Sequence, residues 1–221
     1  MKAAVLVFPG SNCDRDLAEA FRLTGFEVEM VWHKDIALPD RTDVVGVPGG
    51  FSFGDYLRCG AIAARAPIAD ALVRHAGRGG YVLAPCNGFQ IVTELGLLPG
   101  ALIRNAGLTY ICDTVGLRVE ASSAFTDGWG VGQEIALPIA HHEGNYVVSD
   151  DDLARLKDED RIALRYTATP NGARDDVAGV LSANRRVLGL MPHPERAMEP
   201  AHGRTDGMAL FRGLADALVA A

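Results

Sequence analysis

The first half of the chain alternates short apolar runs with segments of helical character. The first run, Ala3–Phe8, is continuous and not alternating, which is typical of a parallel strand buried on both faces of a sheet. A loop containing proline and glycine follows it, as also happens after the third run. The predicted strands of this half are Ala3–Phe8, Phe26–Trp32, Asp43–Val47 and Tyr81–Ala84.

Helical segments separate these runs. Asp14–Thr24 carries its apolar residues on one side and is closed by a glycine, which predicts a helix. Ala61–Gly77 has a helical composition, and Pro67 marks a break or a fresh helix start. Phe89–Leu95 lies in a helix directly after the fourth strand. This alternation predicts an α/β fold, a doubly wound, mostly parallel open sheet with helices on both faces.

The second half of the chain has a different pattern. Its strand-like segments are short and partly alternating, which predicts a small antiparallel extension of the sheet. An amphipathic helix, Met208–Ala220, closes the chain, and no repeat or linker divides it, so we expect one domain over residues 1–221. The predicted strands are Leu108–Cys112, Val115–Val119, Gln133–Ile139, Ile162–Tyr166, Val177–Leu181 and Val187–Met191, with a turn at Asn184-Arg185.

Ser149 precedes three consecutive aspartates, Asp150, Asp151 and Asp152. Serine is a favoured N-cap, and carboxylates in the first turn stabilise a helix through its macrodipole. We therefore interpret this run as the start of a helix and regard metal binding as the weaker alternative.

Composition and charge exclude several classes of protein. The chain has 221 residues, a net charge of −7 and no basic run, which disfavours a nucleic-acid partner. No apolar run approaches the ~20 residues of a membrane span, and the first ten residues lack the features of a signal peptide. The four cysteines, Cys13, Cys59, Cys86 and Cys112, are widely spaced, so we expect free thiols in a reducing cytoplasm.

Cys86 stands at a strand-to-helix junction with small residues at both flanks. Ala84 lies two positions before it and Gly88 two positions after it, the spacing of a nucleophile elbow. A helix N-terminus favours the thiolate, and the N–H of Asn87 would face an oxyanion formed during acyl transfer. A buried structural cysteine is the alternative that this stretch alone leaves open.

His193 and Glu195 are the best candidates for a base and the group that orients it. They follow a predicted strand and alternate with prolines in M-P-H-P-E-R, which favours an extended backbone with both side chains on one side. With Cys86 they predict a catalytic triad at the carboxyl edge of the sheet. An exposed proline-rich loop is the alternative.

Gly49 and Gly50 follow the third predicted strand. Glycines there let a backbone N–H approach a substrate oxygen closely, so the N–H groups of Gly50 and Asn87 would form an oxyanion hole. A plain turn is the simplest alternative. A phosphate-binding loop is disfavoured because the G-K-[ST] motif is absent.

A zinc site built from Cys86, His141, His142 and His193 is a further alternative. These residues lack any recognised ligand spacing, and two adjacent histidines do not easily share one metal. We therefore expect no metal in this chain.

The motifs together resemble the class I, triad-type glutamine amidotransferases, and more narrowly the glutaminase subunits of phosphoribosylformylglycinamidine synthase. The cysteine elbow and the H-P-E segment specify only the wider family, whereas the segments at 49–60 and 141–146 point to this subunit. The matching pieces are Phe8–Asp16, Pro48–Gly60, Cys86–Gln90, Arg104–Leu108, Pro138–Tyr146, Pro170–Gly172 and Gly189–Ala197.

The resemblance implies a function and partners. Cys86 would attack the side-chain amide of glutamine, and Gln90 with Gly49 would help to hold that substrate. The ammonia would pass to a PurL-type synthetase subunit, assisted by a small PurS-type subunit, in purine synthesis. ATP and magnesium would be used by the synthetase, and no cofactor by this chain. Because free ammonia at neutral pH is mostly protonated, its delivery requires docking.

The chain departs from the family pattern at two places. Ala84-Pro85 replaces a glycine and an aliphatic residue before the nucleophile, and His142 replaces a glycine. We expect the elbow to survive the first change. The side chain of His142 must point away from a glutamine pocket or narrow its entrance.

Three other functions stay open on the sequence alone. The chain could be the glutaminase of another pathway, such as pyridoxal phosphate synthesis. It could be a flavodoxin-like cysteine hydrolase or chaperone that uses no glutamine, although such proteins typically take the histidine from next to the elbow. It could also be a binding subunit with a vestigial site.

Overall fold

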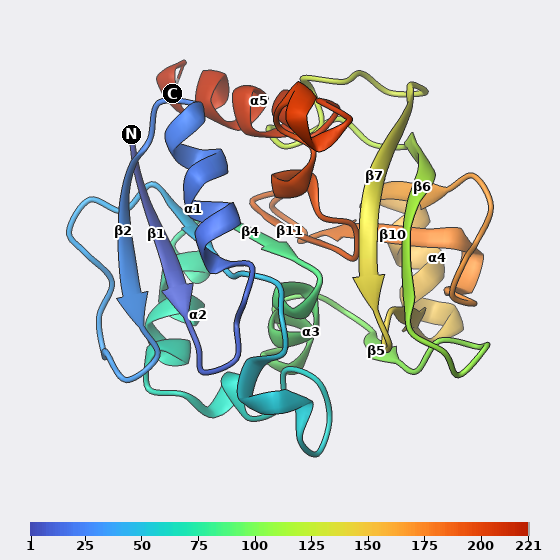
Figure 1. Ribbon diagram of the computed structural model, residues 1–221, viewed down its shortest axis with the longest axis horizontal. Helices are drawn as coiled ribbons and strands as arrows, with labels where there is room; N and C mark the ends of the chain where they lie inside the picture. The colour runs from blue at the N-terminus through green and yellow to red at the C-terminus, as the bar shows by residue number, and fades with distance from the viewer. Residues whose placement is uncertain (221) are drawn as a thin grey trace.

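The computed structural model describes residues 1–220 and contains one large mixed sheet of nine strands. A second, two-stranded sheet pairs β5 (Ala101–Ile103) with β8 (Asn145–Val147). Figure 1 shows helices in front of and behind the large sheet. Across that sheet the strands lie in the order β2 (Glu27–Trp32), β1 (Lys2–Val7), β3 (Val44–Gly46), β4 (Tyr81–Pro85), β11 (Val187–Leu190), β10 (Val177–Leu181), β9 (Ile162–Tyr166), β6 (Ile111–Val119) and β7 (Glu134–His141).

The parallel half consists of β2, β1, β3, β4 and β11. Its inner strands are buried on both faces, as the continuous apolar runs predict. The register places Gly46 of β3 beside Leu83 of β4, and Leu190 of β11 beside Pro85. The last residues of the central strands are therefore level at one edge.

The antiparallel half consists of β10, β9, β6 and β7. The predicted antiparallel extension is thus four strands that continue the main sheet. Ile111 and Cys112, the end of the first expected strand, join Val115–Val119 in the single strand β6, because its pairing with β7 continues unbroken through Asp113 and Thr114. The residues Leu108–Tyr110, also expected in a strand, lie outside it. The strands β5 and β8 were not predicted, since three residues are too few to show a period.

Helices cover both faces of the large sheet (Figure 1), which confirms the predicted α/β class. They are α1 (Asp14–Leu23), α2 (Ile68–Gly77), α3 (Asn87–Glu94), α4 (Asp150–Asp158) and α5 (Met208–Val219). Pro67 directly precedes α2, so the break expected there is a helix start. Single 3-10 turns lie at η1 (Ser52–Asp55), η2 (Ala63–Arg65), η3 (Arg174–Asp176), η4 (Pro194–Arg196) and η5 (Pro200–His202).

Packing contacts assign the helices to faces. A side chain at Gly46 of β3 would lie 2.9 Å from Leu17 of α1. Gly46 lies beside Leu83 of β4, and the next residue of β4, Ala84, faces Gly88 of α3. Successive strand residues point to opposite faces, so α1 and α3 lie on opposite sides. The rings of Phe21 and Phe211 are 5.2 Å apart, which places α5 beside α1, and α2 lies on the side of α3 (Figure 1).

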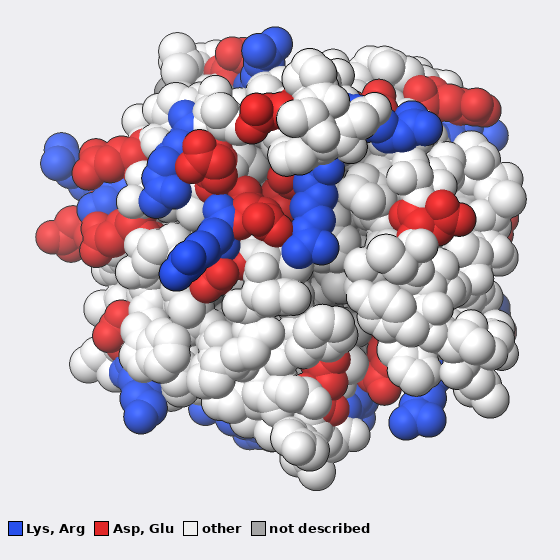
Figure 2. All heavy atoms as spheres, in the orientation of Figure 1, with Lys and Arg blue, Asp and Glu red and all other residues white. Residues whose placement is uncertain are grey.

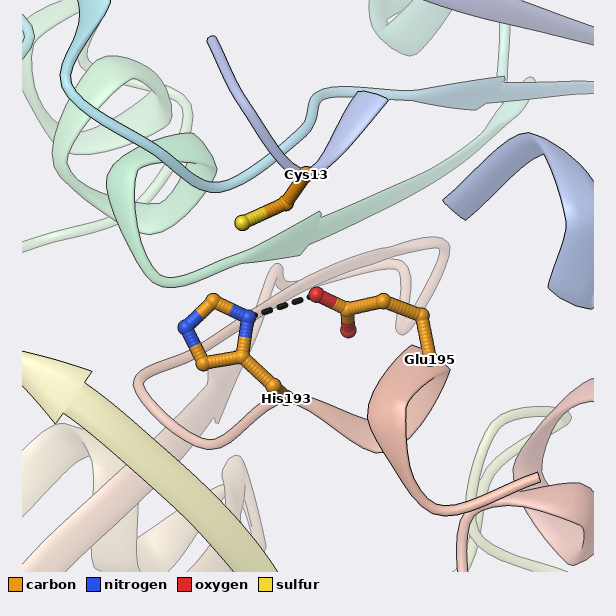
Figure 3. A group of neighbouring side chains, drawn as sticks. All are labelled: Cys13, His193 and Glu195. Atoms are coloured by element: carbon orange, nitrogen blue, oxygen red, sulfur yellow. Dashed lines mark hydrogen bonds and ion pairs between the residues drawn. The ribbon is translucent and has the colours of Figure 1, made fainter. Parts of the chain in front are cut away.

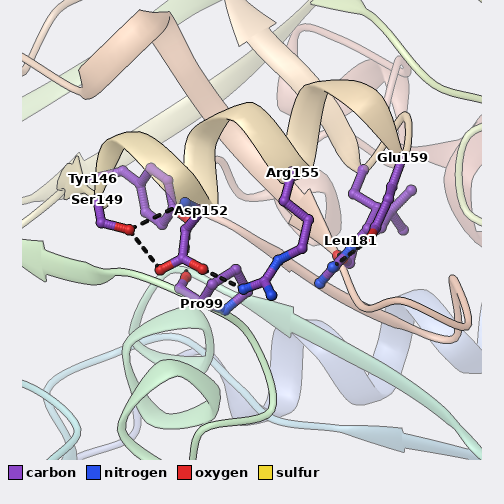
Figure 4. A network of polar contacts seen from close by, with 8 residues as sticks. Pro99, Tyr146, Ser149, Asp152, Arg155, Glu159 and Leu181 are labelled. Carbon is purple, nitrogen blue, oxygen red and sulfur yellow. Dashed lines mark hydrogen bonds and ion pairs between the residues drawn. The ribbon is translucent and has the colours of Figure 1, made fainter.

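The acidic run after Ser149 begins α4, as predicted. The hydroxyl of Ser149 accepts a hydrogen bond from the Asp152 N–H at 3.1 Å and donates one to the Asp152 carboxylate at 2.8 Å (Figure 4). Asp150 pairs with Arg174 on η3. Capping and ion pairing therefore account for these carboxylates.

Replacing Ser149 by alanine should lower the free energy of unfolding by about 1 kcal/mol, because an N–H in the first turn of α4 loses its acceptor. Urea denaturation measures this loss. The matched control is Ser122→Ala, whose exposed hydroxyl bonds only to the Asp127 side chain and should change stability by less than ~0.5 kcal/mol. Equal losses in the two variants would contradict the assigned cap.

Candidate active site

Loops at the carboxyl ends of four parallel strands meet at one edge of the sheet. Cys13 follows β1, Gly49 and Gly50 follow β3, Cys86 follows β4, and His193 follows β11. In open α/β sheets this edge is where ligands bind. All three of the predicted triad positions lie here.

Cys86 lies in the strained turn that the sequence predicts. Its backbone has φ 50° and ψ −109°, between the last residue of β4 and the first of α3. A side chain at Gly88 would overlap the carbonyl oxygen of Val47, so only glycine fits there. Ala84 is fully buried and Pro85 ends β4, so the departure from the family pattern at these two residues leaves the elbow intact.

Gly49 is the point around which the other groups pack. An added Cβ would lie 2.7 Å from Cε1 of His193, 3.3 Å from Cβ of Cys86 and 3.4 Å from Sγ of Cys13. At Gly50, φ is +123° and a Cβ would lie 2.6 Å from the backbone nitrogen of Asn12. Neither position accepts a side chain, so the close approach of this loop to its neighbours requires glycine at both.

His193 and Glu195 form a buried pair. Nδ1 of His193 lies 2.5 Å from Oε1 of Glu195, and the two residues are 1% and 2% exposed. The His193 N–H donates to Pro138 O on β7 at 2.8 Å, which fixes the backbone. The alternative of an exposed proline-rich loop is therefore wrong. The predicted extended backbone is also wrong, because Pro194 begins the 3-10 turn η4 that carries Glu195.

Burial alone lowers the pKa of His193, but negative neighbours reverse the direction. The carboxylate of Glu195 and the thiols of Cys86 and Cys13 hold the pKa of His193 well above its usual range. Nε2 is buried and has no hydrogen-bond partner among the described residues. One imidazole nitrogen is thus bound by a carboxylate and the other is available to a reacting group.

Asn87 and Gln90 are held by internal hydrogen bonds. The Asn87 side chain accepts from the Ser52 N–H at 3.2 Å and donates to Oε1 of Gln90 at 2.7 Å. Nε2 of Gln90 donates to the carbonyl of Glu143 at 2.6 Å. The backbone N–H of Asn87, at the first position of α3, has no intrahelical acceptor. Gln90 therefore links α3 to the segment after β7, and its own amide is committed to these two contacts.

The two histidines at the end of β7 do not form a metal site with Cys86. His141 is buried, with Nδ1 3.1 Å from Oδ1 of Asn105. His142 is exposed and contacts the carbonyl of Leu108 at 3.2 Å. The side chain of His142 thus lies on the outside of the segment that contacts Gln90.

Sequence reasoning missed one member of the cluster, Cys13, although it named this residue among the four cysteines. Figure 3 shows its sulfur directed toward the His193–Glu195 pair. Arg196 donates to this sulfur at 3.1 Å and also bonds to Asp16 of α1 at 3.0 Å. Cys13 lies in the loop that leads from β1 to α1, and β1 is the neighbour of β3, which is the signal that could have found it.

Polar donors that could hold a metal gather at this same place. Within residues 1–220, the one group of three or more such side chains with its ligand atoms in close reach is Cys13, His193 and Glu195.

All four cysteines are free thiols. No helix of the described chain has the length and apolar character needed to cross a membrane.

Comparison with known proteins agrees with the geometry. A family model of the CobB/CobQ-like glutamine amidotransferase domain matches residues 1–207. The chain is 68% identical over 222 residues to phosphoribosylformylglycinamidine synthase subunit PurQ of Ruegeria pomeroyi, and the match covers 100% of both chains. It is 55% identical to the corresponding subunit of Rhodospirillum rubrum, over 99% of this chain and 100% of that one.

Solved structures give the same grouping. A chain in the structure of PurLQS from Thermotoga maritima superposes with a TM-score of 0.91 at 44% identity, and the match covers 98% of each chain. Another glutamine amidotransferase from Thermotoga maritima has a TM-score of 0.68 at 12% identity, covering 100% of this chain and 99% of that one, which shows the shared fold alone.

The pH dependence of stability should report the burial of His141. Burial and the charge of His193 lower the pKa of His141 to about 4. Between pH 6.5 and 4 the unfolded chain therefore binds more protons, so stability is full above this range and falls as the pH falls. The loss of folding stability caused by protonation of His141 is on the order of 3 kcal/mol.

Denaturation across this pH range tests the assignment. The variant His141→Gln should lose correspondingly less stability on acidification, whereas His142→Gln, which changes an exposed neighbour, should follow the wild-type curve. Coinciding curves for wild type and His141→Gln would contradict the prediction.

Proposed function

The chain belongs to the PurQ family of glutamine amidotransferases, and from this membership we propose that it is the glutaminase subunit of a phosphoribosylformylglycinamidine synthase. Its reaction is the hydrolysis of glutamine to glutamate and ammonia through a cysteine thioester. The ammonia serves the ATP-dependent conversion of formylglycinamide ribonucleotide to formylglycinamidine ribonucleotide, a step of purine biosynthesis.

The observation that carries the proposal is the convergence at Gly49. The elbow cysteine Cys86, the imidazole of His193 and the sulfur of Cys13 all lie within 3.4 Å of the position that a Cβ at Gly49 would take. Nucleophile, base, orienting carboxylate and oxyanion donors are the groups that acyl transfer needs.

In the proposed first half-reaction, the thiol proton of Cys86 passes to Nε2 of His193, and the sulfur attacks the side-chain amide carbon of glutamine. A sulfur–carbon bond forms and the carbonyl oxygen becomes an oxyanion, which accepts hydrogen bonds from the N–H groups of Gly50 and Asn87. His193 then gives its proton to the amide nitrogen, the carbon–nitrogen bond breaks, and ammonia leaves. A thioester on Cys86 remains.

In the second half-reaction, neutral His193 removes a proton from water, which attacks the thioester. The sulfur–carbon bond breaks, glutamate leaves, and the sulfur of Cys86 takes the proton back from His193, which restores the thiol. Glu195 keeps Nδ1 of the imidazole occupied, so that Nε2 faces the reacting atoms in both steps. The raised pKa of His193 favours the protonated imidazole that the first step requires.

Substrate binding is assigned to the loop at Gly49 and to the region of Gln90. Gly49 lets glutamine approach the thiol because no side chain stands between them. Gln90 acts through Asn87 and the Glu143 carbonyl, which it holds in place. No metal or cofactor is required of this chain, and ATP and magnesium belong to the partner synthetase.

A separate synthetase must receive the ammonia under cover, because ammonia that escapes into neutral water is mostly protonated and no longer nucleophilic. The partners proposed are a PurL-type synthetase subunit and a small PurS-type subunit, as the name of the similar PurLQS structure supports. The expected compartment is the cytoplasm, where free thiols persist. No nucleic-acid or membrane partner is proposed.

The rim formed by Phe51–Arg58 is the proposed docking surface. It adjoins the Gly49–Gly50 loop, Leu57 is 93% exposed, and Phe51 and Tyr56 are exposed as well. Figure 2 shows mostly uncharged atoms over the lower part of the face, whereas charges of both signs gather over α1. Exposed apolar side chains beside a catalytic mouth are typical of an interface.

A glutamine-mimicking electrophile should modify Cys86 and none of Cys13, Cys59 or Cys112. Peptide mapping of the labelled chain in its complex measures this. Cys86→Ser should abolish labelling, and Cys112→Ser, which removes an exposed thiol, should leave it unchanged. Labelling that persists in folded Cys86→Ser would exclude the proposed nucleophile.

Labelling by the electrophile does not identify the pathway that uses the ammonia. The product formed in the presence of partner subunits distinguishes the rival functions. Glutamine-dependent formation of formylglycinamidine ribonucleotide with purified partner subunits supports this pathway. The proposed base adds a second measurement, since His193→Asn should lower kcat by roughly 10²–10⁴ with intact folding. A flavodoxin-like hydrolase would release no ammonia from glutamine in the complex.

Charge reversal at Arg58 should weaken docking. Its guanidinium forms two 2.6 Å contacts with Glu94 of α3, and Arg58→Glu would place two carboxylates together on the rim. We expect about tenfold weaker binding of the synthetase. Arg118→Glu, an exposed residue of β6, is the control, and equal affinity for both variants would exclude this rim as the interface.

A further inference from the structure

Cys13 is a buried thiol that the proposed reaction does not use. It is 2% exposed, it precedes α1 without a side-chain capping bond, and its sulfur lies 3.4 Å from the place of a missing side chain at Gly49. The mechanism needs one sulfur, and Cys86 supplies it. A second thiol against the catalytic imidazole therefore calls for a separate role.

Three different donor atoms converge there. One atom each from Cys13, His193 and Glu195 lies within 4.8 Å of the others, and all three residues are buried. Two atoms of these residues, Nε2 of His193 and Oε2 of Glu195, are buried and lack hydrogen-bond partners in the described chain. The cluster thus holds more donor capacity than its own hydrogen bonds use.

The donor set selects the metal. A thiolate, an imidazole and a carboxylate are the ligands of borderline-soft Zn²⁺, whereas Mg²⁺ and Ca²⁺ take oxygen ligands. We propose that Cys13, His193 and Glu195 form an inhibitory Zn²⁺ site. Three protein ligands with an open fourth position is the coordination typical of an accessible zinc site.

A small cavity beside the cluster supplies that fourth position. It has a volume of about 30 Å³ and is lined by Cys13, His193 and Arg196 among others. This is room for about one water molecule, the usual fourth ligand. The expected ligands are therefore one sulfur, one nitrogen, one carboxylate oxygen and one water.

The charges around the site are compatible with the ion. A thiolate and a carboxylate neutralise Zn²⁺, so the nearby guanidinium of Arg196 faces a neutral complex. Arg196 already donates to the Cys13 sulfur at 3.1 Å and keeps its pair with Asp16, an arrangement that stabilises a thiolate ligand from outside. No other side-chain cation donates to this sulfur in residues 1–220.

Binding must release protons. The thiol of Cys13 loses its proton to solvent, because a metal ligand must present a lone pair. For the same reason, the proton shared between His193 and Glu195 is also released to solvent. Zinc affinity should therefore rise as the pH increases.

Occupancy would stop the proposed reaction, a consequence that rests on the proposed function. Zinc would take the imidazole that protonates ammonia and the carboxylate that orients it. Zinc binding itself does not depend on glutaminase activity, so a failure of one proposal is distinguishable from a failure of the other.

Calorimetric titration of the purified chain with zinc chloride tests the site. We expect one Zn²⁺ per chain, tighter binding at higher pH, and no binding of magnesium chloride. Cys13→Ser should weaken zinc binding by more than ~100-fold, beyond the ~10–100-fold that follows loss of an outer partner. Cys112→Ser and Cys86→Ser should bind zinc as the wild type does.

Cobalt substitution provides a measurement that needs no variant. A wild-type chain loaded with Co²⁺ should show thiolate-to-cobalt absorption of a single sulfur ligand. In the complex, zinc should inhibit glutamine hydrolysis by the wild type and much less by Cys13→Ser. The proposal is overturned by absence of zinc binding, by unchanged affinity in folded Cys13→Ser, or by loss of binding in either control.

Discussion

The close packing at Gly49 is the constraint on which the rest of the site depends. The loop after β3 passes so near to the imidazole of His193 and to Cys86 that a single methyl group would collide with the ring. That proximity exists because β3, β4 and β11 pair in register and end level with one another. A shift of one residue in either pairing would move one of these groups to the other face.

Much of the fold and the central part of the site could be predicted from the sequence. Continuous apolar runs indicated the parallel strands, Pro67 indicated the start of α2, and Ser149 indicated the start of α4. The elbow was predictable because a strand, a small residue, Cys86 and Gly88 are adjacent in sequence. These signals are local, so one chain segment contains all the information.

What the sequence could not reveal depends on contacts between distant segments. The continuity of β6 follows from its pairing with β7, and the 3-10 turn at Glu195 follows from Pro194 together with the anchoring of His193 to Pro138. Cys13 lies in the matching piece Phe8–Asp16, but nothing in that piece indicates a contact with His193, and only the neighbouring position of β1 and β3 brings its sulfur to the imidazole. The commitment of the Gln90 amide to Asn87 and Glu143 is likewise a tertiary property.

The strand that delivers the imidazole is the last in the chain but lies in the middle of the sheet, between β4 and β10. During synthesis from the amino terminus, the thiol-bearing elbow therefore emerges long before the strand that must insert beside it. A nascent or prematurely terminated polypeptide holds the proposed nucleophile, Cys86, without the proposed proton carrier, His193. Under the proposed mechanism such fragments would be inert toward glutamine, so the topology would tie the onset of nitrogen release to synthesis of the last strand.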